Sequence, residues 1–449
     1  MKLRRRSVAL LAGAAMALTG LAVLPGVQSA LASPTTLAAC SAPTWAEGNT
    51  YTAGTQVTYN SHLYSALVTH TAWPGSGWNP AATPSLWKDL GACTGGPAPS
   101  PSPTTSPKPT PSPTTSPKPT PSASPTPSPA PPGGSTCAVK SRPGGKVLQG
   151  YWENWDGASN GVHPPLGWIP ITDSRIKAHG YNVINAAFPV IRSDGTVLWE
   201  DGMDAGVKVA TPAEMCTAKA AGATILMSIG GAAAGIDLSS STVADKFVST
   251  VVPILKKYNF DGIDIDIETG LTGSGTITSL SASQSNLIRI IDGVLGQMPS
   301  NFGLTMAPET AYVTGGSVTY GSIWGAYLPI VKKYADNGRL WWLNMQYYNG
   351  SMYGCSGDSY QAGTVQGFQV QTDCLNKGLV VQGTTIKVPY DKQVPGLPAQ
   401  PGAGGGYMST GLVSQAYNSS LKGLMTWSIN WDGSKNWTFG DNVRGLQGR

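Results

Sequence analysis

Short apolar runs alternate with amphipathic stretches over the last two thirds of the chain. Apolar or alternating runs predict strands at residues 147–152, 182–188, 224–228, 262–268, 303–307, 343–347, 394–398 and 423–427. Between several of them, as in 243–258 and 283–298, apolar residues recur at the spacing of an amphipathic helix. Alternating strands and helices predict a parallel α/β fold. Eight such units would close a (β/α)8 TIM barrel with its active site at the carboxyl ends of the strands, although the pattern alone also fits a doubly wound sheet.

The first third of the chain follows a different pattern. A charged start, an apolar run over 8–24 and the small residues Ala30-Leu31-Ala32 predict a signal peptide at 1–32, and hence a secreted, extracellular protein. Residues 97–132 are almost all Pro, Ser, Thr and Ala, which cannot bury a core, so 96–134 is expected to be an extended linker. The linker separates a small module at 33–95 from a large domain at 135–449.

Charge and composition limit the partners. Only 12% of residues are charged and no basic run follows the signal peptide, so the footprint of a nucleic-acid-binding protein is missing. A chain rich in Trp and Tyr but weakly charged suits a neutral polysaccharide. Leu37 to Cys40 resembles a lipoprotein box, but it lies far beyond the apolar run. We therefore expect a monomer with neither a nucleic-acid nor a membrane partner.

Cysteine and histidine positions indicate disulfides rather than a metal site. The six cysteines of an exported chain allow fifteen pairings. Locality favours three of them: Cys40–Cys93 in the module, and Cys137–Cys216 and Cys355–Cys374 in the large domain. The four histidines lack metal-ligand spacing and none lies near a G-x-S-x-G elbow, so we expect no metal, no cofactor and no serine triad.

The segment D-G-I-D-I-D-I-E at 261–268 carries the candidate chemistry. Side chains alternate along a strand, so Asp264, Asp266 and Glu268 share one face and the isoleucines the other. In a barrel the acids would face the interior, with Glu268 at the catalytic mouth. Carboxylates this close cannot all ionise cheaply, so at least one pKa should be raised. An acid that keeps its proton near neutral pH is what cleavage of a glycosidic bond requires.

This segment resembles the fourth-strand D-x-x-D-x-D-x-E signature of glycoside hydrolase family 18. Further likenesses are S-I-G-G at 228–231 to the third-strand motif, M-Q-Y-Y-N at 345–349 to the sixth strand of the compact, hevamine-like branch, and M-T-W-S at 425–428 to the eighth strand. Only a short stretch separates the last two expected strands, so the insertion domain of the larger branch is missing. The resemblance implies a secreted bacterial chitinase that acts on chitin and chito-oligosaccharides. It also implies cis peptides at Ala187–Phe188 and Trp427–Ser428.

The family resemblance implies substrate-assisted catalysis with retention, an exception to the usual scheme of two carboxylates. Glu268 would protonate the leaving oxygen and then activate water, while the substrate's N-acetyl oxygen attacks the anomeric carbon. Asp266 would orient the acetamide, and Asp264 would share a proton with Asp266. Tyr348 matches the phenol that bonds the acetamide oxygen, and Gln346 the amide beside it.

Other candidates for substrate binding lie at strand ends. Trp427 would stack beneath the distorted sugar, with core packing as the alternative. Met306 and Glu309, in M-A-P-E, lie where the fifth strand should end and are equally well explained as structural. Trp152, and with it Trp155 and Trp431, could be a subsite platform or packing.

The small module is short and aromatic. Its segment T-H-T at 69–71 and the later P-G, Trp78 and P-S-L-W resemble the family 5/12 carbohydrate-binding module, which binds crystalline chitin through exposed aromatic rings. We expect an all-β module stapled by a disulfide. Tyr64 with Trp78 or Trp73 should form the binding surface, and Trp45 and Trp87 the core. Binding to cellulose is also compatible with the sequence.

Two other functions share these features. An endo-β-N-acetylglucosaminidase acting on N-glycans uses the same strand motif, but the chitin-binding module argues against it. A catalytically dead lectin of this fold usually lacks the acid, and Glu268 is present. The missing insertion should leave an open groove, so we expect endo-acting cleavage.

Overall fold

A computed structural model of the protein describes residues 41–93 except 48, 53, 68–69, 73–78 and 82–85, and residues 136–449 except 156–165 and 233–234. The chain divides into a small and a large unit, and each is described by itself. The expected signal peptide and linker lie outside the described residues, as do Cys40, Trp73 and Trp78.

The large unit is built on a sheet of eight parallel strands. In spatial order they are β13 (Trp342–Leu343), β12 (Gly303–Met306), β11 (Gly262–Asp266), β10 (Thr224–Gly230), β7 (Val183–Ala187), β6 (Val147–Glu153), β19 (Gly423–Trp427) and β18 (Gly396–Pro398). Parallel bridges Leu343–Gln393 and Gln346–Gly396 join the two outermost strands. The sheet therefore closes into the expected (β/α)8 barrel.

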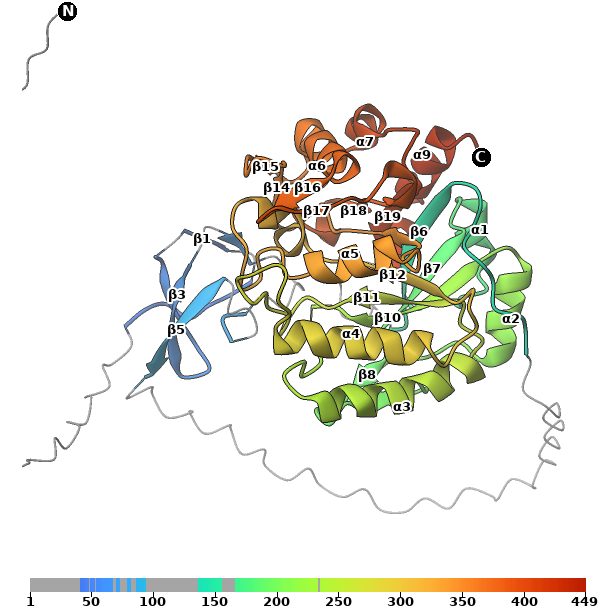
Figure 1. Cartoon of the computed structure of the whole chain (residues 1–449), viewed down its shortest axis with the longest axis horizontal. Coiled ribbons are helices and arrows are strands. Elements are labelled where there is room, and N and C mark those ends of the chain that lie inside the picture. The colour runs from blue at the N-terminus through green and yellow to red at the C-terminus, as the bar shows by residue number, and fades with distance from the viewer. Residues whose placement is uncertain are drawn as a thin grey trace, which may run out of the picture. The chain divides into compact units, whose positions relative to one another are not determined.

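Helices surround the strands on the outside (Figure 1). They are α1 (Ser174–Ala178), α2 (Pro212–Ala220), α3 (Ser241–Lys257), α4 (Ala282–Leu295), α5 (Leu328–Asp336), α6 (Val365–Lys377), α7 (Thr410–Ala416), α8 (Ile429–Gly433) and α9 (Thr438–Leu446). The sequence marks several of their starts, because Thr211 with Glu214 and Ser281 with Gln284 form capping boxes at α2 and α4. No helix in the described ranges is long and apolar enough to cross a membrane.

Short elements fill the connections of the large unit. They are the antiparallel pairs β8 (Val190–Ile191) with β9 (Val197–Leu198), β14 (Ser351–Tyr353) with β15 (Ser359–Gln361), and β16 (Leu379–Val381) with β17 (Thr384–Ile386), and the 3-10 turns η1 (Thr310–Tyr312), η2 (Thr314–Ser317), η3 (Tyr390–Lys392) and η4 (Pro401–Ala403). Only η4 and α7 lie between β18 and β19. The insertion domain of the larger branch is therefore missing from this fully described stretch.

Alternation along the strands sorts side chains into two cores. Ile263, Ile265 and Ile267 lie in the outer core between strands and helices, whereas Asp264 and Asp266 have the opposite parity and face the barrel interior. The parity predicted for the acidic strand is thereby confirmed. The barrel interior includes an apolar cluster of Val147, Tyr151, Val183, Ala187, Leu226, Ala307, Trp341, Trp342, Val394 and Met425.

Two candidates for substrate binding are wrong on the same grounds. Met306 pairs with Ile265 and, like it, is fully buried in the outer core. Trp152 is also fully buried there, and its indole N–H donates to the carbonyl oxygen of Ile169 at 2.9 Å. Side chains alternate along a strand, and Trp152 and Met306 directly follow the inward-facing Tyr151 and Thr305. Both therefore point outward, toward the helices, and not toward the mouth.

Strand lengths differ from expectation at the carboxyl ends. β11 ends at Asp266 rather than at Glu268, and β13 ends at Leu343 rather than at residue 347. Beyond β13 the chain forms isolated bridges instead, such as Glu309–Gln346. The strand ends are released from regular pairing where the acidic and amide side chains gather.

The opposite, N-terminal end of the barrel is fastened by the first described residues of the large unit. Asp261 accepts from the Lys140 backbone N–H at 2.8 Å and forms a buried ion pair with Lys219 at 2.7 Å. Disulfides Cys137–Cys216 and Cys355–Cys374 are present, as predicted. Cys93 is disulfide-bonded, but Cys40 is outside the described residues, so the Cys40–Cys93 pairing stays a prediction.

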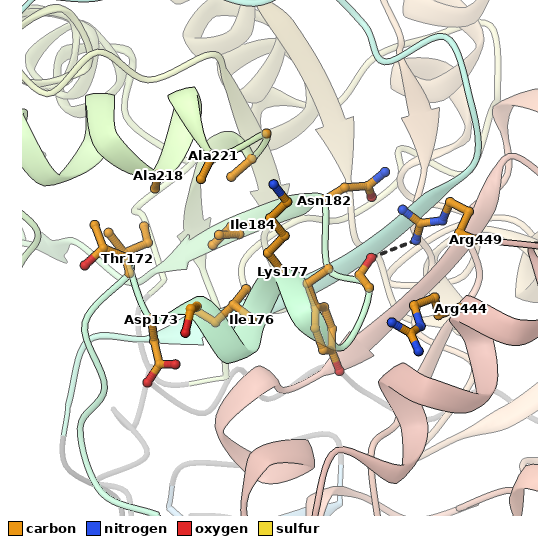
Figure 2. A pocket seen from close by; sticks show the side chains of 16 residues that line it. Thr172, Asp173, Ile176, Lys177, Asn182, Ile184, Ala218, Ala221, Arg444 and Arg449 are labelled. Carbon is orange, nitrogen blue, oxygen red and sulfur yellow. Dashed lines mark hydrogen bonds between the residues drawn. The ribbon is translucent and has the colours of Figure 1, made fainter.

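A cavity of about 410 Å³ opens at this N-terminal end, between α1, the end of α2 and the C-terminal residues. Figure 2 shows Lys177, Asn182, Arg444 and Arg449 lining it. None of the acidic residues of β11 contributes to its wall. The cavity is therefore separate from the carboxyl-end site.

The small unit is all-β. Strands β2 (Gln56–Tyr59), β3 (His62–Ala66) and β5 (Trp87–Ala92) form an antiparallel sheet, and β1 (Thr50–Tyr51) pairs with β4 (His70–Thr71). Trp87 is buried and Trp45 packs against the core, as expected.

The expectation that Tyr64 presents a sugar-binding surface is wrong. Its side chain is only 6% exposed, because alternation along β3 places it with Ala66 on the inner face, against Val57 and Trp87. A buried ring cannot offer its face to a polysaccharide. The other two expected binding residues, Trp73 and Trp78, lie outside the described residues.

Candidate active site

Glu268 lies two residues beyond β11, where hydrogen bonds to its own backbone and to that of Ile267 hold the chain. The phenol of Tyr327 bonds both the N–H and the carbonyl oxygen of Ile267, at 3.0 and 2.9 Å. The phenol of Tyr312 donates to the carbonyl oxygen of Glu268 at 2.8 Å. The side chain is partly exposed, whereas Asp264 and Asp266 are buried. The three acids therefore run from the barrel interior to its mouth.

Asp264 accepts four hydrogen bonds. Oδ2 accepts from Tyr151 and Ser228, each at 2.8 Å. Oδ1 accepts from Thr305 at 2.6 Å and from Asn344 at 3.0 Å. All four donors are neutral, and together they satisfy the lone pairs of a carboxylate. Burial raises the pKa of Asp264, and these four bonds oppose that rise.

Gln346 joins the other two acids. Its Nε2 lies 2.9 Å from Oδ1 of Asp266, 2.9 Å from Oε1 of Glu268 and 3.1 Å from the carbonyl oxygen of Ala307. The two carboxyls also repel each other when both are charged, because the charge of Glu268 raises the pKa of Asp266. Asp264 accepts from four neutral donors, and the expected sharing of a proton between Asp264 and Asp266 stays a prediction.

Burial and mutual repulsion govern ionisation in this site. Burial raises the pKa of Glu268, and burial followed by the charges of Glu268 and Asp264 raises the pKa of Asp266 well above its usual range. No cation in the described ranges contributes to the pKa shifts of these acids. The raised pKa of Glu268 favours the protonated form that a general acid at the mouth needs.

Glu309 adds a further carboxyl group. It follows β12, its backbone bridges to that of Gln346, and its side chain makes no capping bond to the turn η1 that it begins. Burial, and then the charge of Glu268, raise the pKa of Glu309 to about 8. Of the two M-A-P-E candidates, the structure thus brings only Glu309 to the acids.

Tyr348 lies beside the same group. Its ring is 6% exposed, and burial followed by the charges of Asp266 and Glu268 raises the pKa of its phenol. Among the described residues we find no hydrogen-bond partner for its hydroxyl. The phenol is therefore a neutral donor within the field of the acids.

Aromatic rings line the mouth beside the acids. Phe188 and Trp427 stack with centroids 6.0 Å apart and planes 15° apart, and both rings are partly exposed. The ring centroids of Tyr151 and Trp155 lie 5.4 and 6.1 Å from that of Trp427. The expected cis peptides Ala187–Phe188 and Trp427–Ser428 are present. A flat apolar wall with a row of acids next to it suits the face and the polar edge of a sugar ring.

Two glycines are required for this wall to approach the acids. A Cβ on Gly230 would lie 2.2 Å from the carbonyl oxygen of Asp266, and one on Gly231 would lie 2.8 Å from the ring of Phe188. Both have positive φ, +109° and +82°. The S-x-G-G motif thus serves close packing through its glycines, while its Ser228 bonds Asp264.

The sequence did not reveal three of the groups that hold Asp264: Tyr151, Thr305 and Asn344. Strand register could have found Thr305, which pairs directly with Asp264 on the neighbouring strand. Inward parity on the sixth strand likewise selects Asn344, two positions before Gln346. Trp431, in α8, packs against the outer core. Among the described residues, no group of His, Cys, Asp and Glu side chains could hold a metal ion.

Comparisons with known proteins agree with this geometry. Residues 147–313 match the family model "Glycosyl hydrolases family 18", and residues 44–88 match "Carbohydrate-binding module family 5/12". A solved family 18 chitinase from Chromobacterium violaceum is 27% identical, with a TM-score of 0.59, and the match covers 91% of this chain and 100% of that one.

Two curated relatives are much more similar in sequence. "Endochitinase 4" of Metarhizium robertsii is 83% identical over 69% of this chain and 91% of its own. "Endochitinase 37" of Trichoderma harzianum is 82% identical over 69% of this chain and 92% of its own. Both organisms are fungi, so these relatives give no support to the expected bacterial source. With identity this high over nearly the whole of both relatives, the chain belongs to glycosyl hydrolase family 18.

Proposed function

We propose that this protein is an endo-acting chitinase that hydrolyses the β-1,4 linkages between N-acetylglucosamine units. The observation that carries the proposal is the pair of acids Asp266 and Glu268, both bonded by Gln346 and close to a pair of stacked aromatic rings. The names of the two fungal relatives and the match to a carbohydrate-binding module support chitin as the substrate.

Glu268 is the acid and base of the reaction. Its position at the mouth and its raised pKa suit the transfer of a proton to the leaving oxygen. The transfer leaves Glu268 as a carboxylate. The same group can then accept a proton from the incoming water.

The substrate's acetamide acts as the nucleophile in this mechanism. Its carbonyl oxygen attacks the anomeric carbon, the bond to the leaving oxygen breaks, and an oxazolinium-type ion forms. Asp266 accepts from the acetamide N–H and balances the positive charge, while the phenol of Tyr348 donates to the acetamide oxygen. Water then opens the ion, and the product keeps the β configuration.

The remaining residues have supporting roles. Trp427 lies beneath the sugar, and Asp264, with its four neutral donors, adds a fixed negative charge behind Asp266. The short connection between β18 and β19 supports an open groove that admits internal linkages of a long chain. No metal and no cofactor is part of this mechanism.

The rest of the chain serves the same substrate. We assign 1–32 to a signal peptide of a secreted protein, 33–95 to a chitin-binding module, 96–134 to a linker and 135–449 to the catalytic barrel. The module holds the enzyme on insoluble chitin, and the protein acts as a monomer.

Product analysis on colloidal chitin and on an N-glycosylated protein, in parallel, tests this function. The expected result is release of chito-oligosaccharides of several lengths and no release of N-glycans. Release of N-glycans alone would favour an endo-β-N-acetylglucosaminidase, and binding without any products would favour a lectin.

A further inference from the structure

Glu153 and Asn154 are consecutive residues at the end of β6. Their side chains form hydrogen bonds to the two segments that carry the stacked rings of Phe188 and Trp427. Both are buried, with 0% and 1% of their surface exposed. A carboxyl and an amide are costly to bury unless they are hydrogen-bonded, so their contacts indicate what they are for.

Asn154 holds the segment that carries Phe188. Its side-chain Nδ2 donates to the carbonyl oxygen of Phe188 at 3.0 Å, and its backbone N–H donates to that of Ala187 at 2.9 Å. Asn154 therefore bonds the carbonyl oxygens of both Ala187 and Phe188, and so holds the backbone that carries the Phe188 ring.

Glu153 holds the segment that carries Trp427. The hydroxyl of Ser428, the next residue, donates to Oε1 of Glu153 and accepts from the backbone N–H of Trp431 at 3.1 Å, as the N-cap of α8. The backbone N–H of Glu153 donates to Oδ1 of Asn430 at 3.1 Å. The residues that follow Trp427 are thus hydrogen-bonded to the end of β6.

The two bonded segments meet in one stack. Phe188 directly follows β7 and Trp427 ends β19, yet their rings lie 15° from parallel. Neither Glu153 nor Asn154 is bonded to Asp264, Asp266 or Glu268 in the structure. The bonds described here connect both residues to the segments that carry the stacked rings.

We propose that Glu153 and Asn154 are positioning residues that set the sugar-binding wall, Glu153 through Ser428 and Trp427, and Asn154 through Phe188. The inference rests on the proposed function, in which Trp427 lies beneath the reacting sugar. Loss of either bond should let the ring move, and a displacement of about 1 Å in a substrate-positioning group can cost about 100-fold in rate.

Asn154 has a matched control at the other end of the same two strands. Asn182 also joins β6 and β7, through Nδ2 to the carbonyl oxygen of Lys146 at 3.0 Å and through Oδ1 from the N–H of Leu148 at 2.9 Å. It lines the distant cavity of Figure 2. Asn154→Ala and Asn182→Ala therefore remove similar bonds, and both should lower the melting temperature.

Only Asn154→Ala should lower kcat/KM on chitotetraose, by about 10–100-fold. Equal losses of kcat/KM in the two variants, or unchanged kcat/KM in Asn154→Ala, would show that Asn154 serves stability only and would overturn its assignment.

A double-mutant cycle tests Glu153. Glu153→Ala should lower kcat/KM by about 10–100-fold in the wild-type background but by less than about threefold in Trp427→Ala, because the ring through which it acts is gone. Glu153→Gln keeps an acceptor for Ser428 and should stay within about threefold of wild type. The same factor in both backgrounds would overturn the assignment.

The affinity for chitotetraose, measured by calorimetry on all these variants, separates a failure of the proposed function from a failure of the positioning role of Glu153 and Asn154. Wild-type protein that binds but does not cleave would contradict the proposed function. The pattern of affinities across the cycle would still decide whether Glu153 and Asn154 position the wall.

Discussion

The side-chain Nε2 of Gln346 lies 2.9 Å from Oε1 of Glu268. The same nitrogen lies 2.9 Å from Asp266, so one neutral amide from the sixth strand reaches two acids of the fourth. A donor to a carboxylate stabilises its charged form, and accordingly Gln346 opposes the rise in pKa of both acids. The amide limits how far burial can push the site toward its protonated state.

Replacing this amide should shift the pH dependence of the reaction. Gln346→Leu removes the donor, so the pKa of Asp266 should rise further and the acidic limb of kcat/KM should move to higher pH. A hydrogen bond to a charged group contributes about 1.5–3 kcal/mol, which corresponds to a loss of about 10–150-fold at the optimum. The pH profile on chitotetraose gives both quantities.

Gln371 is the matched control, since it is a fully buried glutamine that bonds Thr314 and the backbone of Tyr353. Gln371→Leu should lower the melting temperature without moving the acidic limb. A shift of the limb in this control, or none in Gln346→Leu, would contradict the role given to Gln346.

Removal of the proton donor should abolish turnover but not binding. Glu268→Gln keeps the size of the side chain, loses its acidity and should lower kcat by about 10²–10⁴-fold or more. Lys177→Met, in the cavity at the opposite end of the barrel, should leave kcat unchanged. Turnover of Glu268→Gln within tenfold of wild type would exclude Glu268 as the acid.

Glu309 should affect stability in a pH-dependent manner. The folded protein holds its proton to about pH 8, whereas an unfolded glutamate releases it near 4.5. Between these values the folded state binds more protons, so this group's contribution to stability falls as pH rises, by at most about 1.4 kcal/mol per pH unit. Urea unfolding at pH 5, 6.5 and 8 should therefore show a shallower decline for Glu309→Gln than for wild type.

The same variant bears on mechanism, because Glu309 is a second carboxyl close to the acid. If the acetamide is the nucleophile, Glu309→Gln should keep turnover within about tenfold of wild type, since no covalent bond to Glu309 is made. A loss beyond about 10³-fold with intact folding would instead assign Glu309 a direct part in the chemistry.

Deletion of residues 33–134 should separate binding from chemistry. A tethered binding module raises the local concentration of enzyme on a surface, so activity on insoluble chitin should fall while activity on soluble oligosaccharides stays nearly the same. Rates on both substrates, measured side by side, check this. Equal losses would mean that the deleted region supports the catalytic fold.

The sequence predicted those features that depend on local alternation. The barrel strands and the inward direction of Asp264 and Asp266 follow from the two-residue period, and the outward isoleucines confirm it. The two disulfides within the large unit agree with the pairing expected from locality and export, although the sequence alone did not decide the pairing within the barrel. Most of the remaining site residues came from family motifs.

Contacts between distant strands were harder to predict. Met306 and Trp152 lie at strand ends as expected, but one step of parity turns each toward the helices. The prediction for Tyr64 failed for the same reason, because its position along the strand places its ring on the inner face of the sheet, in the core of the small unit. The hydrogen bonds to Asp264 come from the first, third, fifth and sixth strands of the barrel, which no single segment contains.

The substrate's own acetamide, rather than an enzyme carboxylate, is the nucleophile in the proposed mechanism. Partially deacetylated chitosan tests this directly, because each cut bond follows either an N-acetylglucosamine or a glucosamine. Mass-spectrometric sequencing of the products from wild-type protein should find N-acetylglucosamine at every new reducing end, since only that sugar has the attacking carbonyl. Glucosamine at new reducing ends in proportion to its abundance in the polymer would contradict the mechanism.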